Sequence, residues 1–157
     1  MKALLNGATP TPVELTPHFE LREIMAADID QWWPKLRPEI EAIIQRSPEV
    51  CDFMPEEVYV FLKRRVAFLH VGFLDGEYAG FGILRKEVMP FSREPYLSSW
   101  VGAGLKGEAV DLYFAALDNI ARACGAKKVQ HMGRIGWMRR PPPGWRTVGV
   151  IQEKRLD

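Results

Sequence analysis

The residues with the clearest chemical potential form a glycine-rich stretch at residues 101–109, VGAGLKGEA, between an apolar run and an amphipathic run. A turn that leads into a helix presents several backbone N–H groups and the positive end of the helix dipole, and these bind phosphate without any charged side chain. The same glycines can instead serve only to turn a strand into a helix. The candidate cofactor-binding residues are Gly102, Ala103, Gly104, Leu105, Lys106, Gly107 and Glu108.

The cysteine and histidine residues do not have the spacing of a metal site. Cys51 and Cys124 stand apart rather than in a Cys-x-x-Cys pair, and two cysteines are too few for a disulfide framework. His18, His70 and His131 are scattered, without the spacing of paired metal-binding histidines on a helix. We therefore expect no metal, and we interpret both cysteines as reduced, buried small side chains.

The overall composition is that of one globular domain. The chain has 157 residues, of which 47% are hydrophobic and 26% charged, and its formal net charge is +1. A nearly neutral chain has no general attraction for nucleic acid or for an anionic membrane, so neither partner is expected. There is no secretory signal pattern and no apolar run near the ~20 residues that span a bilayer. The expected location is the cytoplasm in which the chain is made.

Hydrophobic periodicity predicts the elements that position the glycine-rich stretch. Strands are expected at residues 18–25, 66–74, 77–88, 95–104, 126–132 and 145–156, and helices at 26–47, 51–65 and 108–124. Asp75-Gly76 is the strongest hairpin signal in the chain. Pro34 is expected to break the first helical region, and Pro38 to begin a second helix within it.

This order of elements predicts an α/β fold in which a mixed, mostly antiparallel, twisted sheet is flanked by helices. A single domain is expected over residues 18–157. Residues 1–17 contain Pro10, Pro12 and Pro17 and are expected to form an extended N-terminal arm. Free ends of this composition usually fray, so we expect the arm to be held by the domain or by a partner.

The same order, with a glycine-rich turn that opens the helix after the fourth strand, resembles the GNAT superfamily of acetyl-CoA-dependent N-acyltransferases. The resemblance covers about residues 18–156 and is strongest in FELREIMAADIDQWW, GFLDGEYAGFGIL and GEAVDLYFAALDNIARACGAKKVQ. The closing pattern GRIGW…GW…VIQEKRL is similar to divergent GNAT-like proteins of tailed bacteriophages, some encoded near virion genes. The resemblance implies a GNAT-like fold, acetyl-CoA as cofactor and an amine as acyl acceptor.

The glycine-rich stretch departs from the family pattern, which is Arg or Gln, two residues, Gly, one residue, then Gly or Ala. If Gly102 and Gly104 fill the last two positions of the pattern, Ser99 stands where Arg or Gln is required. If Gly107 and Ala109 fill them, Gly104 stands at the Arg or Gln position. A carboxylate at Glu108 also satisfies the positive end of the helix and repels a diphosphate, although Lys106 offsets part of this. We expect acetyl-CoA to bind weakly or not at all.

The acid and base of the family are also missing. Many GNAT enzymes place a tyrosine four residues before a Gly-Phe pair; here the pair is Gly144-Trp145 and the matching residue is Arg140. Glu94 is expected in a loop, and Ser98 and Ser99 are poor bases. No catalytic residue is assigned from the sequence.

Aromatic and basic residues are concentrated in GRIGWMRRPPPGW, residues 133–145. Tryptophan and arginine are the residues that most often anchor protein interfaces, so Trp137, Arg139, Arg140 and Trp145, with the arm of residues 1–17, are candidate contacts with another protein chain, either a phage structural protein or a second copy. Two functions remain. One is a GNAT-fold structural or assembly protein, virion-associated, with a degenerate acetyl-CoA site; the alternative is an active N-acetyltransferase that acts on an unknown amine.

Overall fold

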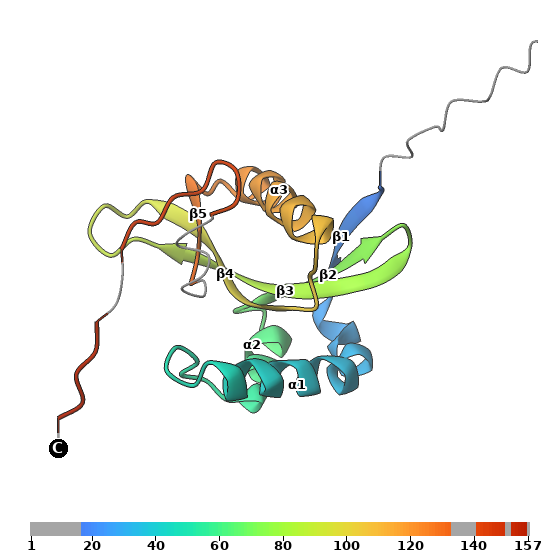
Figure 1. Ribbon diagram of the computed structural model, residues 1–157, viewed down its shortest axis with the longest axis horizontal. Helices are drawn as coiled ribbons and strands as arrows, with labels where there is room; N and C mark the ends of the chain where they lie inside the picture. The colour runs from blue at the N-terminus through green and yellow to red at the C-terminus, as the bar shows by residue number, and fades with distance from the viewer. Residues whose placement is uncertain (1–16, 133–140, 150–151, 157) are drawn as a thin grey trace, which may run out of the picture.

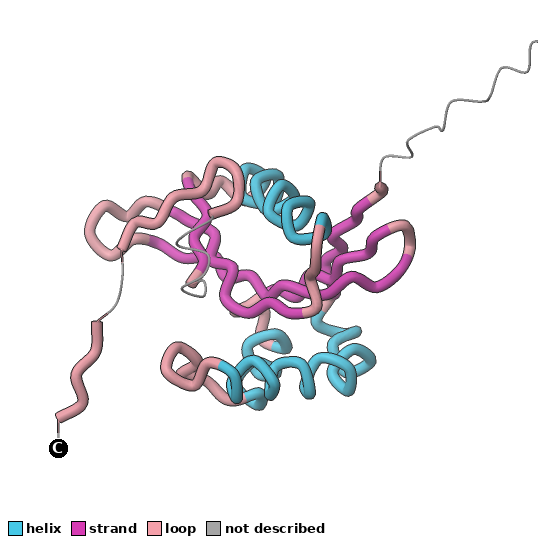
Figure 2. The backbone as a smooth tube through the Cα atoms, viewed as in Figure 1, coloured by secondary structure: helices cyan, strands magenta, loops and turns pink. Residues whose placement is uncertain are grey.

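The computed structural model describes residues 17–132, 141–149 and 152–156. In chain order, the elements are β1 (Phe19–Ile24), the short 3-10 helix η1 (Ala26–Asp28), α1 (Ile29–Arg46), α2 (Pro55–Lys63), β2 (Phe68–Leu74), β3 (Glu77–Val88), β4 (Pro95–Ala103), α3 (Glu108–Ala123) and β5 (Lys128–His131) (Figures 1 and 2). The strands form one sheet in the order β1-β2-β3-β4-β5. Its first three pairings are antiparallel and β4–β5 is parallel, so the predicted mixed, mostly antiparallel sheet is confirmed.

The hairpin between β2 and β3 forms where the sequence predicts it. Asp75 and Gly76 have φ angles of 50° and 82°, and such a two-residue turn has the twist that suits a hairpin. The turn is also tied to the start of β1, because Asp75 N–H donates to the carbonyl of His18 at 2.7 Å and His18 N–H donates to Asp75 Oδ1 at 2.9 Å. The hairpin and the first strand therefore hold each other in register.

Helices cover both faces of the sheet, α1 and α2 on one side and α3 on the other (Figure 1). The alternation of side chains along β3 serves both layers. Phe81 and Ile83 are fully buried in the cluster beneath α1 and α2, whereas Leu84 belongs to the cluster beneath α3. The central strand thus joins two hydrophobic cores that are otherwise separated by the sheet.

Pro34 does not break the first helical region, contrary to the prediction. The helix α1 runs without interruption from Ile29 to Arg46 and contains both Pro34 and Pro38. Each proline lacks one backbone donor and crowds the preceding turn. The helix holds because its inner stripe of Ile29, Leu36 and Ile40 is at most 1% exposed, and this burial outweighs the local cost.

The last predicted strand, residues 145–156, is absent from the described part of that range. Residues 145–149 and 152–156 have no strand pairing. Immediately before this range the chain makes a turn, in which Trp145 N–H donates to the carbonyl of Pro142 at 3.0 Å. With Pro143 and Gly144 (φ 80°) in its central positions, this is a type II β-turn, the kind that this residue pair favours.

Candidate functional site

The glycine-rich stretch connects β4 to α3, as predicted. Gly104 and Gly107 both have positive φ, 79° and 55°, and Gly107 is the residue that precedes the first turn of α3. No side chain caps this end of the helix. The N–H groups of Ala109 and Val110 donate to nearby carbonyls at 3.2 Å, while those of Gly107 and Glu108 have no partner among the described residues. The start of α3 therefore presents free backbone donors.

Close packing explains why glycine is needed at part of this turn. A Cβ on Gly80 would lie 2.8 Å from the backbone nitrogen of Leu105, and a Cβ on Gly104 would lie 2.9 Å from the Cα of Gly80. Both positions also have positive φ. Gly80 of β3 and Gly104 of the turn thus allow two backbones to touch. By contrast, a Cβ on Gly107 would meet nothing within 4 Å, so the packing of the chain gives no reason for a glycine there beyond its φ angle.

A carboxylate that the sequence analysis missed lies beside this turn. Glu39, on α1, accepts a hydrogen bond from the Tyr78 hydroxyl at 3.1 Å, and its Oε2 would be 3.4 Å from a Cβ on Gly104. Together with the exposed Glu108, it brings two carboxylates to the glycine turn, where the exposed Lys106 supplies an ammonium group. The ammonium of Lys35 lies over the Tyr78 ring, 3.6 Å from its centroid. Nothing in the local sequence signals Glu39, because the contact joins residues that are 65 positions apart.

Among the described residues, strand β4 has an unpaired side next to this turn. On one side it pairs with β3 as far as Ala103, but on the other it pairs with β5 only over Tyr96–Ser99. Between Ile83 and Leu84 the β3–β4 register shifts, which leaves Trp100 as the extra residue of a β-bulge. From Trp100 to Ala103, no described strand covers the β5 side of β4, so its backbone groups form a short edge that leads directly to the start of α3.

A pair of hydroxyl groups lies at the beginning of this open edge. Ser99, the last β4 residue that pairs with β5, has its Oγ 2.9 Å from the hydroxyl of Tyr113 on α3. Tyr113 is 3% exposed, and burial raises its pKa to about 12, although the bond to Ser99 acts in the opposite direction. A Cβ on Gly82 would collide with the Tyr113 hydroxyl, so this glycine is what admits the ring above β3.

An aromatic cluster continues from this pair toward the C-terminal segment. Phe114 of α3 packs edge-on against Trp145, with ring centroids 4.9 Å apart, and Trp145 lies 5.0 Å from the ring of His131. Burial lowers the pKa of His131. Trp145, a candidate interface residue, is therefore half-buried on the α3 side of its own chain.

The bulge residue Trp100 faces the other side of the sheet, where it packs against rings and a guanidinium. Phe53 and Phe61 lie 5.1 and 5.6 Å from it, and the Arg85 guanidinium carbon lies 5.2 Å from its ring. Arg85 also pairs with Glu87 at 2.8 Å, while its buried Nε has no hydrogen-bond partner. The aromatic contacts hold the bulge in place.

The remaining predicted residues are dispersed. Glu94 lies in the β3–β4 loop and pairs with Lys128 at 3.1 Å, so it is not near Ser99 as a base. Trp137, Arg139, Arg140 and residues 1–16 lie outside the described residues. Within the described residues, no group of three or more His, Cys, Asp or Glu side chains is placed to hold a metal ion. No helix in this part of the chain is long and apolar enough to cross a membrane.

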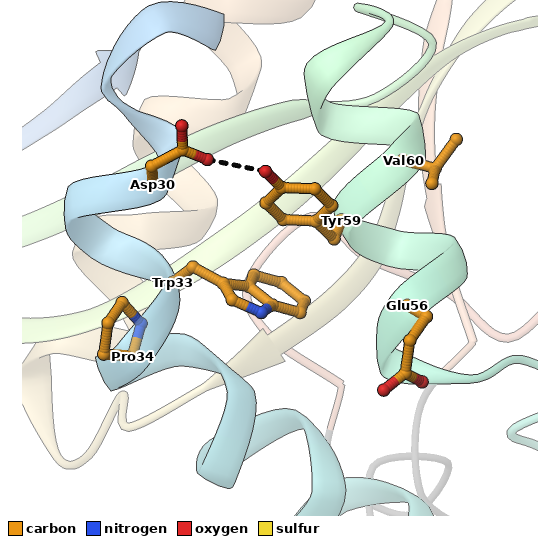
Figure 3. A pocket seen from close by; sticks show the side chains of 6 residues that line it. All are labelled: Asp30, Trp33, Pro34, Glu56, Tyr59 and Val60. Atoms are coloured by element: carbon orange, nitrogen blue, oxygen red, sulfur yellow. Dashed lines mark hydrogen bonds between the residues drawn. The ribbon is translucent and has the colours of Figure 1, made fainter.

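A separate groove of about 300 Å³ lies between α1 and α2 (Figure 3). It is lined by Asp30, Trp33, Pro34, Glu56, Tyr59 and Val60. The Tyr59 hydroxyl donates to Asp30 Oδ1 at 2.6 Å, and the Trp33 and Tyr59 rings meet edge-on at 5.1 Å. The carboxylates of Asp30 and Glu56 lie at opposite ends of the groove (Figure 3). We call this feature the α1–α2 groove.

No protein-family profile matches this sequence, and no curated protein matches it. Solved structures do match. An aminoglycoside acetyltransferase from an uncultured soil metagenomic sample superposes with a TM-score of 0.59 at 13% identity, covering 88% of this chain and 97% of its own. A ribosomal-protein-alanine N-acetyltransferase from Brucella melitensis biovar Abortus 2308 does so with a TM-score of 0.60 at 12% identity, covering 89% and 99%. An integron cassette protein of V. cholerae matches with a TM-score of 0.57 at 9% identity, covering 88% and 92%. The protein therefore has the α/β GNAT-like fold, and its structure resembles those of acetyltransferases.

Proposed function

We propose that the protein is an N-acyltransferase that takes an acyl group from an acyl-coenzyme A thioester and transfers it to an amine. The observation that carries this proposal is the open edge of β4 from Trp100 to Ala103, which runs into the uncapped start of α3. The proposal is supported by the fold, which the protein shares with acetyltransferases that differ in their acceptors.

The open edge suits the shape of the cofactor. The pantetheine arm of coenzyme A is an extended chain with two amide groups, and an extended chain with amides binds to an exposed strand edge by backbone hydrogen bonds. At the end of that edge, the free N–H groups of Gly107 and Glu108 suit an anionic oxygen. We assign the edge to the pantetheine arm and the turn of residues 102–108 to the diphosphate.

Ser99 and Tyr113 then fill the role of the missing acid. The cofactor supplies the acyl group as a thioester. The amine nitrogen bonds to the thioester carbon, the carbon–sulfur bond breaks, and the sulfur leaves with the electron pair. In this proposal the Ser99 hydroxyl, 2.9 Å from that of Tyr113, donates a proton to the departing sulfur, and Tyr113 passes a proton to Ser99 and regains one from solvent. The nitrogen loses its extra proton to solvent.

A second candidate is a GNAT-fold structural or interaction protein, including a virion-associated one, that no longer binds the cofactor. Glu39 and Glu108 favour it, because two carboxylates beside the turn oppose a diphosphate while Ser99 stands in place of the usual Arg or Gln. The matched structures described above include two acetyltransferases and no phage protein, so the phage role stays a prediction.

Titration calorimetry with acetyl-CoA separates the two. Binding at micromolar affinity, about −8 kcal/mol, supports the transferase, and absence of binding supports the second candidate. Transfer is then measured by release of free thiol with a panel of amines that includes an aminoglycoside and an alanine-terminated peptide, the acceptor classes in the names of the matched enzymes. A protein that binds acetyl-CoA but acylates no amine in a broad panel would contradict the proposal.

A further inference from the structure

The α1–α2 groove is separate from the site proposed for acyl transfer. The residues of α1 and α2 that face the sheet, such as Leu36, Val58 and Leu62, are at most 2% exposed. Asp30, Pro34, Glu56 and Val60 lie on the opposite sides of these helices and are exposed. The groove therefore opens away from the sheet, and its contents cannot touch the open edge of β4.

The lining of the groove suits a proline-containing segment with positive charges. Prolyl rings pack on surfaces made of aromatic rings and aliphatic side chains. Proline-rich segments also have backbone carbonyls that are not used in internal hydrogen bonds. The Trp33 indole N–H donates to no other described residue and is available for one of these carbonyls. Asp30 and Glu56 place a carboxylate at each end.

The chain itself carries a segment of this chemistry. Residues 141–146 read PPPGWR, a proline run followed closely by an arginine. Pro141, Pro143, Gly144 and Arg146 are exposed, and the β-turn that begins at Pro142 holds them at the surface. We call residues 141–146 the proline turn. Its exposed Arg146 suits the exposed carboxylate of Glu56 in the groove, which already bonds Arg37 at 2.7 Å. A carboxylate accepts more than one hydrogen bond, so Glu56 can take a second partner.

The proline turn cannot reach the groove of its own chain. Trp145 is fixed against Phe114 of α3, on the face of the sheet opposite α1 and α2. We propose that the proline turn of one copy docks into the α1–α2 groove of a second copy. The two surfaces lie on opposite faces of the molecule, so the contact joins copies head to tail and builds rings or short chains.

Analytical ultracentrifugation over a range of concentrations tests this proposal. We expect the wild-type protein to self-associate, and we expect Glu56→Arg and Arg146→Glu each to weaken association about ten-fold or more, because each leaves like charges face to face. Mixing the two variants should restore association, since the reversed groove of one meets the reversed turn of the other. Glu49→Lys and Arg122→Glu, exposed charges outside both surfaces, are matched controls that should behave as wild type.

A second measurement identifies the occupant. A peptide with the sequence PPPGFR, residues 141–146 with phenylalanine in place of Trp145, contains no tryptophan. Its binding should therefore change the protein's tryptophan fluorescence, and the change should be lost in Trp33→Phe. A wild-type protein that stays monomeric at the highest soluble concentration would overturn the proposal. So would association that survives both charge reversals, or that disappears when residues 1–16 are removed, because the arm would then be the occupant. Acetyl-CoA binding should be the same in all these variants, which separates this test from that of the proposed function.

Discussion

At the scale of single residues, Tyr113 is a deeply buried ionisable group that belongs to the proposed site. Its hydroxyl is buried and bonded to Ser99, and burial raises its pKa from the ordinary value near 10 to about 12. The neutral form is therefore favoured in the folded protein. The contribution of Tyr113 to the free energy of unfolding is fully present below pH 10. It is lost as the pH rises from 10 toward 12, because the tyrosine ionises at lower pH in the unfolded chain than in the folded protein.

We predict that Tyr113→Phe reduces this alkaline sensitivity. Between pH 8 and pH 11, the free energy of unfolding of the wild type should fall by about 1.4 kcal/mol more than that of the variant. Urea denaturation at both pH values gives the comparison, and the value at pH 8 accounts for the cost of losing the hydroxyl itself. Equal losses in both proteins would mean that Tyr113 is not buried as described.

A second residue-scale prediction concerns Gly82, over which the Tyr113 ring lies. Gly82→Ala places a methyl group against the Tyr113 hydroxyl and should lower the free energy of unfolding by about 2 kcal/mol or more. Gly102→Ala is the matched control in the neighbouring strand, where the nearest atom, the carbonyl oxygen of Phe81, is 3.3 Å away, and it should cost less than about 1 kcal/mol. Combining Gly82→Ala with Tyr113→Leu should cost less than the sum of the two changes, because the clash is removed. Purely additive costs would place the ring elsewhere.

At the scale of elements, the helix α1 carries an internal cost that a substitution can remove. Pro38 lies within α1 with its ring exposed, away from the groove, and it withholds one helical hydrogen bond. We predict that Pro38→Ala raises the free energy of unfolding by about 1 kcal/mol, since the restored hydrogen bond outweighs the greater freedom of the unfolded chain. Thermal unfolding followed by circular dichroism measures the change. A lower unfolding temperature would show that α1 depends on a bend at this proline.

The start of α3 gives a prediction about the cofactor. Neutralising either carboxylate beside the glycine turn, by Glu39→Gln or Glu108→Gln, should strengthen acetyl-CoA binding about two- to five-fold. Asp118→Asn removes a charge from the same helix, far from its start, and serves as the control. Calorimetry gives the affinities. If both glutamine variants bind acetyl-CoA more weakly than wild type, these carboxylates help to hold the cofactor instead of opposing it.

At the scale of the whole molecule, the two hydrophobic cores share β3, so neither can be lost alone. We predict that the loss of tertiary and secondary structure coincides in urea. The double variant Trp137→Phe/Trp145→Phe retains only Trp32, Trp33 and Trp100, which pack in the core beneath α1 and α2. Its fluorescence transition should overlay its far-ultraviolet circular dichroism transition. Separate midpoints would mean that the α1–α2 layer unfolds independently of the layer beneath α3.

Features that depend on neighbouring residues were predictable from the sequence, and features that depend on distant ones were not. Asp75-Gly76 dictates its hairpin locally, and the apolar stripes gave the helices, so the fold class followed. The path of α1 through Pro34 depends on burial against the sheet. The last strand was predicted from the pattern of its own residues, but a strand needs a pairing partner from a distant segment, and the described residues 145–149 and 152–156 pair with none. Glu39 beside the glycine turn and the bulge at Trp100 arise from pairing between distant segments, which no short motif encodes.

The contact between Gly80 and Gly104 determines which substitutions these two positions tolerate. If both codons were randomised together and the folded clones sequenced, glycine should return at both positions. A small residue at one position should not compensate for a larger residue at the other. Each site clashes with main-chain atoms of the other's segment, which have no rotamer to yield. If the codon for Gly107 is randomised, glycine should also return there, although a Cβ would meet nothing within 4 Å. Its φ of 55° and ψ of −133° lie outside the left-handed helical region that asparagine and aspartate accept. The same residue type would then be required at Gly104 by its neighbour and at Gly107 by its own backbone.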